Sequence, residues 1–117
     1  MNKKLRLGVI GAGSWAVAAH LPTLAARKEE VEFVGVCRPD EEALSRIQQQ
    51  FGFAVASTEY RDILEHDLDI VVVASPSGFH HEHATAALSS GAHVLVEKPV
   101  AISGADAWDM VETAKEN

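Results

Sequence analysis

The chain has 117 residues, of which 47% are hydrophobic and 23% charged, a composition that suits one small globular domain. Its 17 Asp and Glu outnumber 10 Lys and Arg, and the net charge of −7 argues against nucleic acid or anionic membranes as partners. The single cysteine, Cys37, cannot form an internal disulfide, and no apolar stretch is long enough to span a bilayer, so we expect a cytoplasmic protein.

Short apolar runs alternate with segments of helical periodicity along the whole chain. In chain order the pattern predicts a strand at 5–10, a helix at 14–27, a strand at 31–37, a helix at 40–51, a weak strand at 54–56, a short helix at 60–65, a strand at 68–74, a helix at 79–90, a strand at 93–96 and a helix at 103–115. Pro22 falls inside the first helix, so we expect that helix to bend or restart near His20. Ser103 and Asp106 have the spacing of a capping box.

This alternation of strands and helices predicts an α/β fold, a doubly wound and mostly parallel sheet of the Rossmann type. Near-continuous apolar strands such as Ile70–Ala74 agree, because both faces of a parallel sheet are covered. In such a sheet the ligand crevice lies at the carboxyl ends of the strands. The last helix runs to Asn117 with no closing strand, so we expect a single domain, residues 1–117, that is cut short.

A glycine-rich motif, Gly-Ala-Gly-Ser-Trp-Ala, follows the first strand at residues 11–16. This G-x-G-x-x-A pattern between a strand and a helix is the dinucleotide fingerprint. The first glycine permits a tight turn, the second lets a pyrophosphate approach the backbone, and the helix N-terminus attracts its charge. We therefore assign cofactor binding to Gly11, Ala12, Gly13, Ser14 and Trp15. The alternative is a glycine-rich turn without a ligand.

The end of the second strand bears on the choice between NAD and NADP. Folds that bind NAD usually place an acid here for the ribose 2′-hydroxyl, whereas an arginine suits the 2′-phosphate of NADP. Arg38 directly follows Cys37, so we predict NADP as the cofactor, with NAD as the alternative. In that alternative Arg38 is solvated and Asp40 takes the ribose, although Pro39 and Asp40 also resemble an ordinary helix start.

Polar residues follow the strongest strand, in the stretch Ser75 to His83. Hydroxyl and backbone groups there can face a nucleotide, so we assign Ser75, Pro76 and Ser77 to the cofactor site. Three histidines, at 80, 81 and 83, invite a metal interpretation, but the sequence suggests no fourth ligand. We expect no metal and histidines on the helix surface, with His80 near the cofactor pocket as an intermediate possibility.

A charged pair and a proline, Glu97-Lys98-Pro99, end the fifth strand. Lysine and glutamate are seldom buried unless they are paired, and proline cannot donate a hydrogen bond to a sheet. The carboxyl end of a strand is the ligand side of such a sheet, so we expect the pair to face the crevice. Glu97 would orient the Lys98 ammonium through a charge-assisted hydrogen bond.

Together these motifs resemble the N-terminal domain of the Gfo/Idh/MocA oxidoreductases, named after glucose–fructose oxidoreductase and inositol dehydrogenase. The resemblance covers the whole chain and rests on Gly11-Ala12-Gly13, His20-Leu21-Pro22, Ser75-Pro76-Ser77, His80, Glu82-His83 and above all Glu97-Lys98-Pro99. It implies that Lys98 is the catalytic lysine beside the nicotinamide, and that Glu97, Lys98 and His80 adjoin the cofactor. It also implies a cis peptide bond between Lys98 and Pro99.

The resemblance implies hydride transfer to or from a CH–OH group of a sugar-like or polyol substrate. It also suggests a homo-oligomer as the parent protein. Ser75 and Ser77 stand where the family commonly has Thr and Asn, and Arg38 where it commonly has Asp. The second domain of the family, which supplies most of the substrate pocket and the usual catalytic histidine, is not in this chain. We therefore expect the isolated chain to bind cofactor with little or no turnover.

A missing domain also predicts exposed apolar surface on the last helix, with Trp108 and Met110 as candidates unless both pack inward. Two other functions stay open: a stand-alone NADP-binding or sensing module, and a methyltransferase-like domain that binds S-adenosylmethionine. Glu97-Lys98-Pro99 argues against the second, which has no use for a lysine there.

Overall fold

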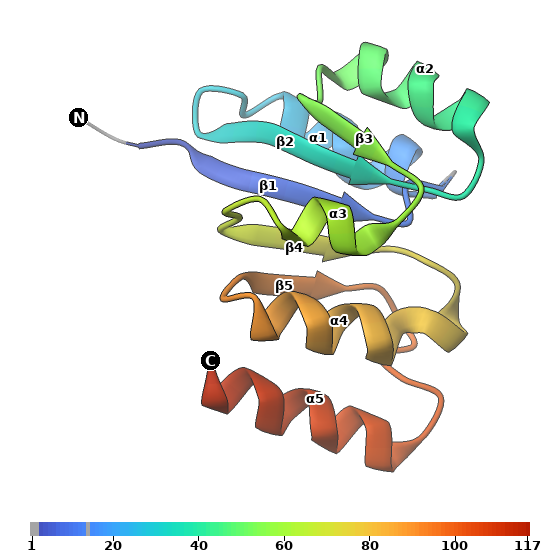
Figure 1. Ribbon diagram of the computed structural model, residues 1–117, viewed down its shortest axis with the longest axis vertical. Helices are drawn as coiled ribbons and strands as arrows, with labels where there is room; N and C mark the ends of the chain where they lie inside the picture. The colour runs from blue at the N-terminus through green and yellow to red at the C-terminus, as the bar shows by residue number, and fades with distance from the viewer. Residues whose placement is uncertain (1–2, 14) are drawn as a thin grey trace.

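One parallel five-stranded sheet forms the centre of the molecule (Figure 1). The computed structural model describes residues 3–13 and 15–117. The strands are β1 (Leu5–Ile10), β2 (Val31–Cys37), β3 (Val55–Ser57), β4 (Ile70–Val73) and β5 (His93–Val96), in the spatial order β3-β2-β1-β4-β5. The order reverses between β1 and β4, which is where a doubly wound sheet binds its ligand. The predicted Rossmann-type fold is confirmed.

Helical segments connect the strands. They are η1 (Ala16–His20), α1 (Leu21–Ala25), α2 (Glu41–Phe51), α3 (Tyr60–Leu64), η2 (Ser77–Phe79), α4 (His80–Ser89) and α5 (Gly104–Glu116). The predicted change near His20 is confirmed, since the π-helical turn η1 gives way to α1 there and Pro22 lies in the first turn of α1. Ser103 caps α5 by accepting a hydrogen bond from the Asp106 N–H.

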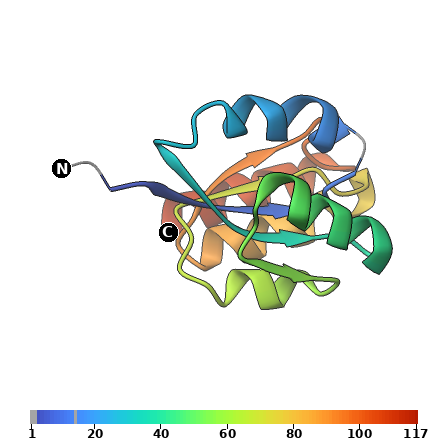
Figure 2. The ribbon, with the colours of Figure 1, turned by 90° about the horizontal axis from the view of Figure 1, so that it is seen from above.

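Two apolar layers cover the two faces of the sheet. On one face η1, α1 and α2 bury the layer around Leu7, Val9, Val36 and Val72. On the other face α3, α4 and α5 bury the layer around Val71 and Val73. Figure 2 shows the blue helix α1 on one side of the sheet and the yellow-green helix α3 on the other. The layers reach the carboxyl ends of the strands, where Ile10, Cys37 and Val73 are still buried.

The last helix, α5, packs outside α4 and contributes little to the core (Figure 1). Trp108 is 68% exposed, as predicted, whereas Met110 is 6% exposed, so the prediction for Met110 is wrong. Met110 packs into the layer that α4 forms with the sheet, because it lies on the side of α5 that faces α4. Within the described residues, every helix is too short or too polar to cross a membrane.

Candidate functional site

The loop after β1 makes a turn that only glycine fits. Gly11 has a φ of +86°, and a Cβ atom there would lie 2.3 Å from the backbone nitrogen of Ser75. The Gly11 N–H donates to the Cys37 carbonyl at 2.9 Å, so the turn is attached to the end of β2. The loop after β4 therefore rests directly on Gly11.

The second glycine of the motif has open space beside it instead. A Cβ atom at Gly13 would meet only the Gly11 carbonyl oxygen, at 4.0 Å. This side of the loop can accept a phosphate group close to the backbone. Ala12 is fully buried and contributes its carbonyl oxygen, which accepts a hydrogen bond from Arg38 Nη1 at 3.0 Å. Ser14, predicted to bind the cofactor, lies outside the described residues.

Three adjoining cavities form a groove along the carboxyl ends of the strands, here called the carboxyl-end groove. Ser75 and Pro76 line all three cavities. The cavity at the Arg38 end has a volume of about 210 Å³, the middle cavity over Gly13 about 400 Å³, and the cavity at the Lys98 end about 430 Å³. The groove thus runs from Arg38 past the glycine-rich loop to Lys98, the elongated shape that a dinucleotide needs.

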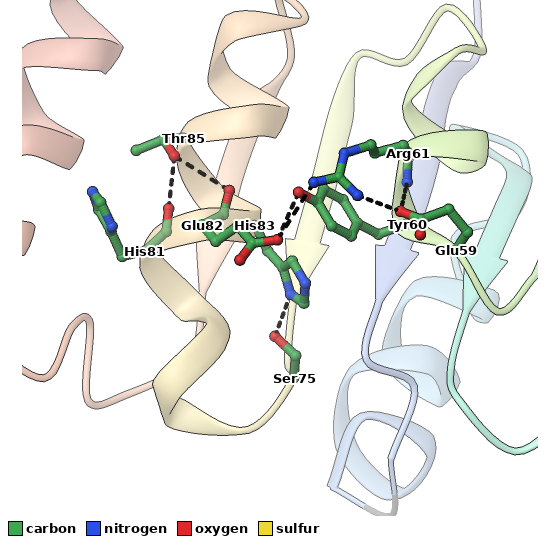
Figure 3. A network of polar contacts seen from close by, with 8 residues as sticks. All are labelled: Glu59, Tyr60, Arg61, Ser75, His81, Glu82, His83 and Thr85. Atoms are coloured by element: carbon green, nitrogen blue, oxygen red, sulfur yellow. Dashed lines mark hydrogen bonds and ion pairs between the residues drawn. The ribbon is translucent and has the colours of Figure 1, made fainter.

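Aromatic side chains and one histidine wall the Arg38 end. Tyr60 and His83 are both 9% exposed, and their ring centroids lie 4.4 Å apart. Phe79 stacks on the other side of His83, with a centroid distance of 5.6 Å. Ser75 Oγ lies 2.8 Å from His83 Nδ1 (Figure 3), so the loop after β4 is fastened to α4 at this point.

A charged cluster holds Tyr60 in place from the outside (Figure 3). The Tyr60 hydroxyl donates to Glu82 Oε2 at 2.8 Å. The Arg61 guanidinium lies 4.7 Å from the Tyr60 ring centre and pairs with Glu59 at 3.0 Å. Arg61 therefore partly neutralises Glu59, which is the one carboxylate among the described residues lining this end of the groove.

Burial favours the neutral form of three groups at this end, Cys37, Tyr60 and His83. Burial raises the pKa of the Cys37 thiol to about 11, with Glu59 and Asp62 adding to the effect, so Cys37 is not a reactive thiolate. Burial also raises the pKa of Tyr60, and its hydrogen bond to Glu82 raises it further. The pKa of His83 lies below its ordinary value, again mainly because of burial.

At the other end, Trp15, Ser77, His80, Glu97 and Lys98 line the cavity. Glu97 does not bind the Lys98 ammonium, so that prediction is wrong. Instead His20 Nε2 and Glu97 Oε2 lie 2.6 Å apart. The bond from His20 is the main reason that the pKa of Glu97 is lowered, with Trp15 and the Lys98 N–H adding to it. The Glu97 carboxylate is thus engaged by a side chain of η1 rather than by its neighbour in the sequence.

The peptide bond between Lys98 and Pro99 is cis, as predicted. Lys98 lies just beyond β5, whose ladder with β4 closes with the Glu97 N–H donating to Val73 O at 2.9 Å. Lys98 is exposed and lines the same cavity as Ser77 and His80. The charged strand end therefore faces the groove and not the core.

Two of the three neighbouring histidines are buried, which corrects the prediction of a histidine surface. His80 is 2% exposed and His83 9% exposed, and they share one helix face with Ala84 and Ala87. Only His81 points outward, where its Nε2 lies 2.7 Å from Asp109 of α5. The spacing of the two histidines from Ala84 and Ala87 was the sequence signal for this buried face, because residues three and four apart lie together on a helix.

The structure gathers most of the predicted site residues in one groove. These are Gly11, Gly13, Trp15, Arg38, Ser75, Pro76, Ser77, His80, Glu97 and Lys98. Sequence reasoning missed Glu59, Tyr60, Phe79 and His83, which wall the Arg38 end, and His20, which holds Glu97. The position of residues 58–60 directly after β3 was an available signal, since the carboxyl ends of parallel strands meet at one edge of the sheet.

The family comparison agrees with this geometry. The family model described as "Oxidoreductase family, NAD-binding Rossmann fold" matches residues 5–117. The chain belongs to this family. The predicted resemblance to the Gfo/Idh/MocA oxidoreductases is thereby confirmed, and the chain is an NAD(P)-binding Rossmann domain of that family.

Individual relatives include sugar-modifying oxidoreductases. D-glucoside 3-dehydrogenase of Escherichia coli is 34% identical over 97% of this chain and 32% of its own length. The WlbA dehydrogenase of Chromobacterium violaceum, solved with NADH and UDP-GlcNAcA, superposes with a TM-score of 0.91 at 30% identity over 99% of this chain and 33% of that one. A 3-ketoreductase from Actinomadura kijaniata, solved with NADP and TDP-benzene, gives a TM-score of 0.89 at 31% identity over 97% of this chain and 35% of that one.

The chain thus spans about a third of the length of these relatives. Their names as dehydrogenases and a reductase do not favour a stand-alone sensing module. The family match likewise favours a dinucleotide over S-adenosylmethionine.

Proposed function

We propose that this domain binds NADP in preference to NAD, and that the whole protein transfers a hydride between the nicotinamide and a CH–OH carbon of a sugar-like substrate. The observation that carries the proposal is the carboxyl-end groove, which has Arg38 at one end and Lys98 at the other. The glycine-rich loop lies between them, with open space beside Gly13 for a pyrophosphate. The residues present therefore fit a dinucleotide.

The preference for NADP rests on Arg38 and Asp40. Within the described residues the Arg38 side chain forms one hydrogen bond, to Ala12 O, so further guanidinium N–H groups can meet a phosphate. Asp40 instead caps α2, accepting hydrogen bonds from the Glu42 and Ala43 N–H groups. It is engaged away from the ribose position, which argues against the NAD alternative.

Lys98 is the proposed catalytic residue. When bound, the nicotinamide supplies the centre that accepts or gives the hydride. The Lys98 ammonium would donate a hydrogen bond to the substrate oxygen and stabilise negative charge that develops there. Glu97, held by His20, lines the same cavity as Lys98. The remaining substrate contacts would come from the part of the protein that the relatives have beyond this domain.

Calorimetric titration of the chain with NADP⁺ and, separately, with NAD⁺ tests the proposal. We expect tighter binding of NADP⁺. The Arg38→Asp variant should lose at least about tenfold in affinity for NADP⁺ and little for NAD⁺, since a carboxylate repels the 2′-phosphate. The Arg46→Asp variant makes the same charge change on the exposed face of α2 and should bind both cofactors like the wild type.

Two results would count against the proposal. Equal loss in Arg38→Asp and Arg46→Asp would mean that overall charge, and not a 2′-phosphate contact, sets the affinity. Tighter binding of NAD⁺ by the wild type would overturn the preference for NADP.

A further inference from the structure

His80 is a buried ring with a backbone carbonyl oxygen at each nitrogen. Its Nδ1 lies 2.7 Å from Pro99 O and its Nε2 2.6 Å from Ser75 O, and the residue is 2% exposed. Both distances are those of strong hydrogen bonds. Carbonyl oxygens only accept hydrogen bonds, so each nitrogen must carry a proton to make its bond. A neutral imidazole has one N–H group, whereas the imidazolium has two.

The surroundings of His80 contain both favourable and unfavourable charges. Among the described residues, Glu97 and Lys98 line the same cavity from the segment after β5, and His83 lies one turn along α4. Glu97 and the two carbonyl acceptors favour a positive ring, whereas burial, Lys98 and the helix N-terminus oppose one. His83 is the neutral partner of the pair, because burial lowers its pKa and the nearby His80 lowers it further.

The two carbonyls belong to the two segments that the groove needs. Ser75 lines every part of the carboxyl-end groove, and Pro99 directly follows Lys98. The ladder between β4 and β5 closes at Glu97 N–H and Val73 O, before either carbonyl is reached. Within the part of the chain that the structure describes, the His80 ring is the polar link between these segments beyond that point.

We propose that His80 is a positioning residue for Lys98: with a proton on both ring nitrogens, it ties the Pro99 carbonyl to the Ser75 carbonyl. The ring thereby fixes the segment that carries Lys98 against the loop that lines the cofactor groove. Loss of one ring proton removes one of the two bonds and frees one segment. We call this pair of hydrogen bonds from His80 to Pro99 O and Ser75 O the His80 clamp. Its importance for catalysis rests on the proposed role of Lys98, but the two bonds themselves need no cofactor.

The ring protons can be observed directly by nitrogen-15 NMR of the histidine side chains in the wild-type chain at neutral pH. We expect both His80 nitrogens to show the signals of protonated nitrogens, each coupled to its own hydrogen. His81, partly exposed on the same helix and paired with Asp109, is the internal reference for a ring outside the core. A deprotonated signal from either His80 nitrogen would overturn the proposal, since a histidine with a merely structural role needs only one N–H group.

Hydrogen exchange then tests the positioning of Lys98. In His80→Gln the side-chain amide donates from one nitrogen, where the ring donates from two. Protection of the Glu97 amide, which donates to Val73 O at 2.9 Å where the ladder closes, should therefore fall about tenfold, as for the loss of one charge-assisted hydrogen bond. The matched control His81→Gln should leave this amide unchanged, and Val72 in the core reports global opening. The proposal would be contradicted if amide protection were unchanged in His80→Gln, or if the wild type showed no protection at this amide.

These outcomes are separable from the proposed function. If NADP⁺ fails to bind but the ring carries two protons, the clamp stands and the cofactor preference falls. If His80→Gln does not fold, the ring-nitrogen measurement on the wild type still decides.

Discussion

The two ends of the carboxyl-end groove are built differently. At the Arg38 end three of the wall residues belong to the core, since Cys37, Tyr60 and His83 are all less than a tenth exposed, whereas Phe79 is 50% exposed. At the Lys98 end Trp15 is 63% exposed, and the segment that follows Lys98 carries Val100 and Ile102, which are 45% and 71% exposed. Lys98 itself is exposed.

This difference in burial suggests that the two ends of the groove have different roles, one in stability and the other in chemistry. Side chains at the Arg38 end serve the core and the groove at once, so changes there should alter folding and cofactor binding together. Side chains at the Lys98 end can vary without opening the core, so they are available for chemistry. The predictions that follow test this division, beginning with the largest effect.

Gly11, in the glycine-rich loop between the two ends of the groove, should tolerate substitution least. Gly11→Ala would combine an unfavourable positive φ with a Cβ atom 2.3 Å from the Ser75 nitrogen. We expect a loss of about 4 kcal/mol in the free energy of unfolding, measured by urea denaturation.

Gly13→Ala is the matched control for that change. Its Cβ atom meets only one atom within reach, at 4.0 Å, so the free energy of unfolding should change by less than about 0.5 kcal/mol. Its affinity for NADP⁺ should nevertheless fall, because the added methyl group occupies the space that fits a phosphate. Equal stability losses in the two variants would remove the distinction between a structural and a ligand-facing glycine.

Tyr60→Ala tests the Arg38 end. Removing a ring that packs on His83 and into the core should cost about 3 kcal/mol in the free energy of unfolding and weaken NADP⁺ binding as well. Tyr60→Phe keeps the ring and loses only the bond to Glu82, so it should cost about 1 kcal/mol and leave binding unchanged. A stable Tyr60→Ala variant with normal binding would show that this wall is dispensable.

The sequence predicted the strands and the groove better than it predicted the contacts. Strand periodicity located β1, β2 and β5 at their observed bounds, and the motif order located the residues at both ends of the groove. These features follow from local patterns, in which each residue carries its own signal.

Side-chain partners depend on how elements meet, which a single sequence does not show. Glu97 binds His20, 77 residues away, because η1 packs beside the end of β5. His80 and His83 look like surface residues by polarity, yet η2 turns the start of α4 so that they face the sheet. Polar residues that fill core positions were therefore the main source of error.

The pH dependence of stability should also differ between the ends. His83 has a pKa below its ordinary value of 6.5, so below pH 6.5 the unfolded chain binds this proton more readily. Stability therefore falls as the pH drops from 6.5 towards the folded pKa, by at most about 1.4 kcal/mol per pH unit. Thermal unfolding across this range should be less pH-dependent in His83→Gln than in the wild type, whereas His81→Gln should keep the wild-type slope.

At the Lys98 end the pH dependence of stability comes from Glu97 and lies at lower pH. Its pKa lies below the ordinary value of 4.5, so its contribution is present above pH 4.5 and is lost as the pH falls through the folded pKa. If His83→Gln instead changed stability only below pH 4.5, the assignment of the two windows to the two ends would be reversed.

The smallest effect on stability is expected at Lys98. Lys98→Ala removes an exposed side chain at the open end, so the free energy of unfolding should change by less than about 0.5 kcal/mol in urea denaturation. Affinity for NADP⁺ should change by less than about tenfold, because the proposed contact of Lys98 is to the substrate. A loss of stability as large as that in Tyr60→Ala would place Lys98 in the folding core. The open end would then be a second structural wall, and its exposed charge would no longer mark the place where the chemistry occurs.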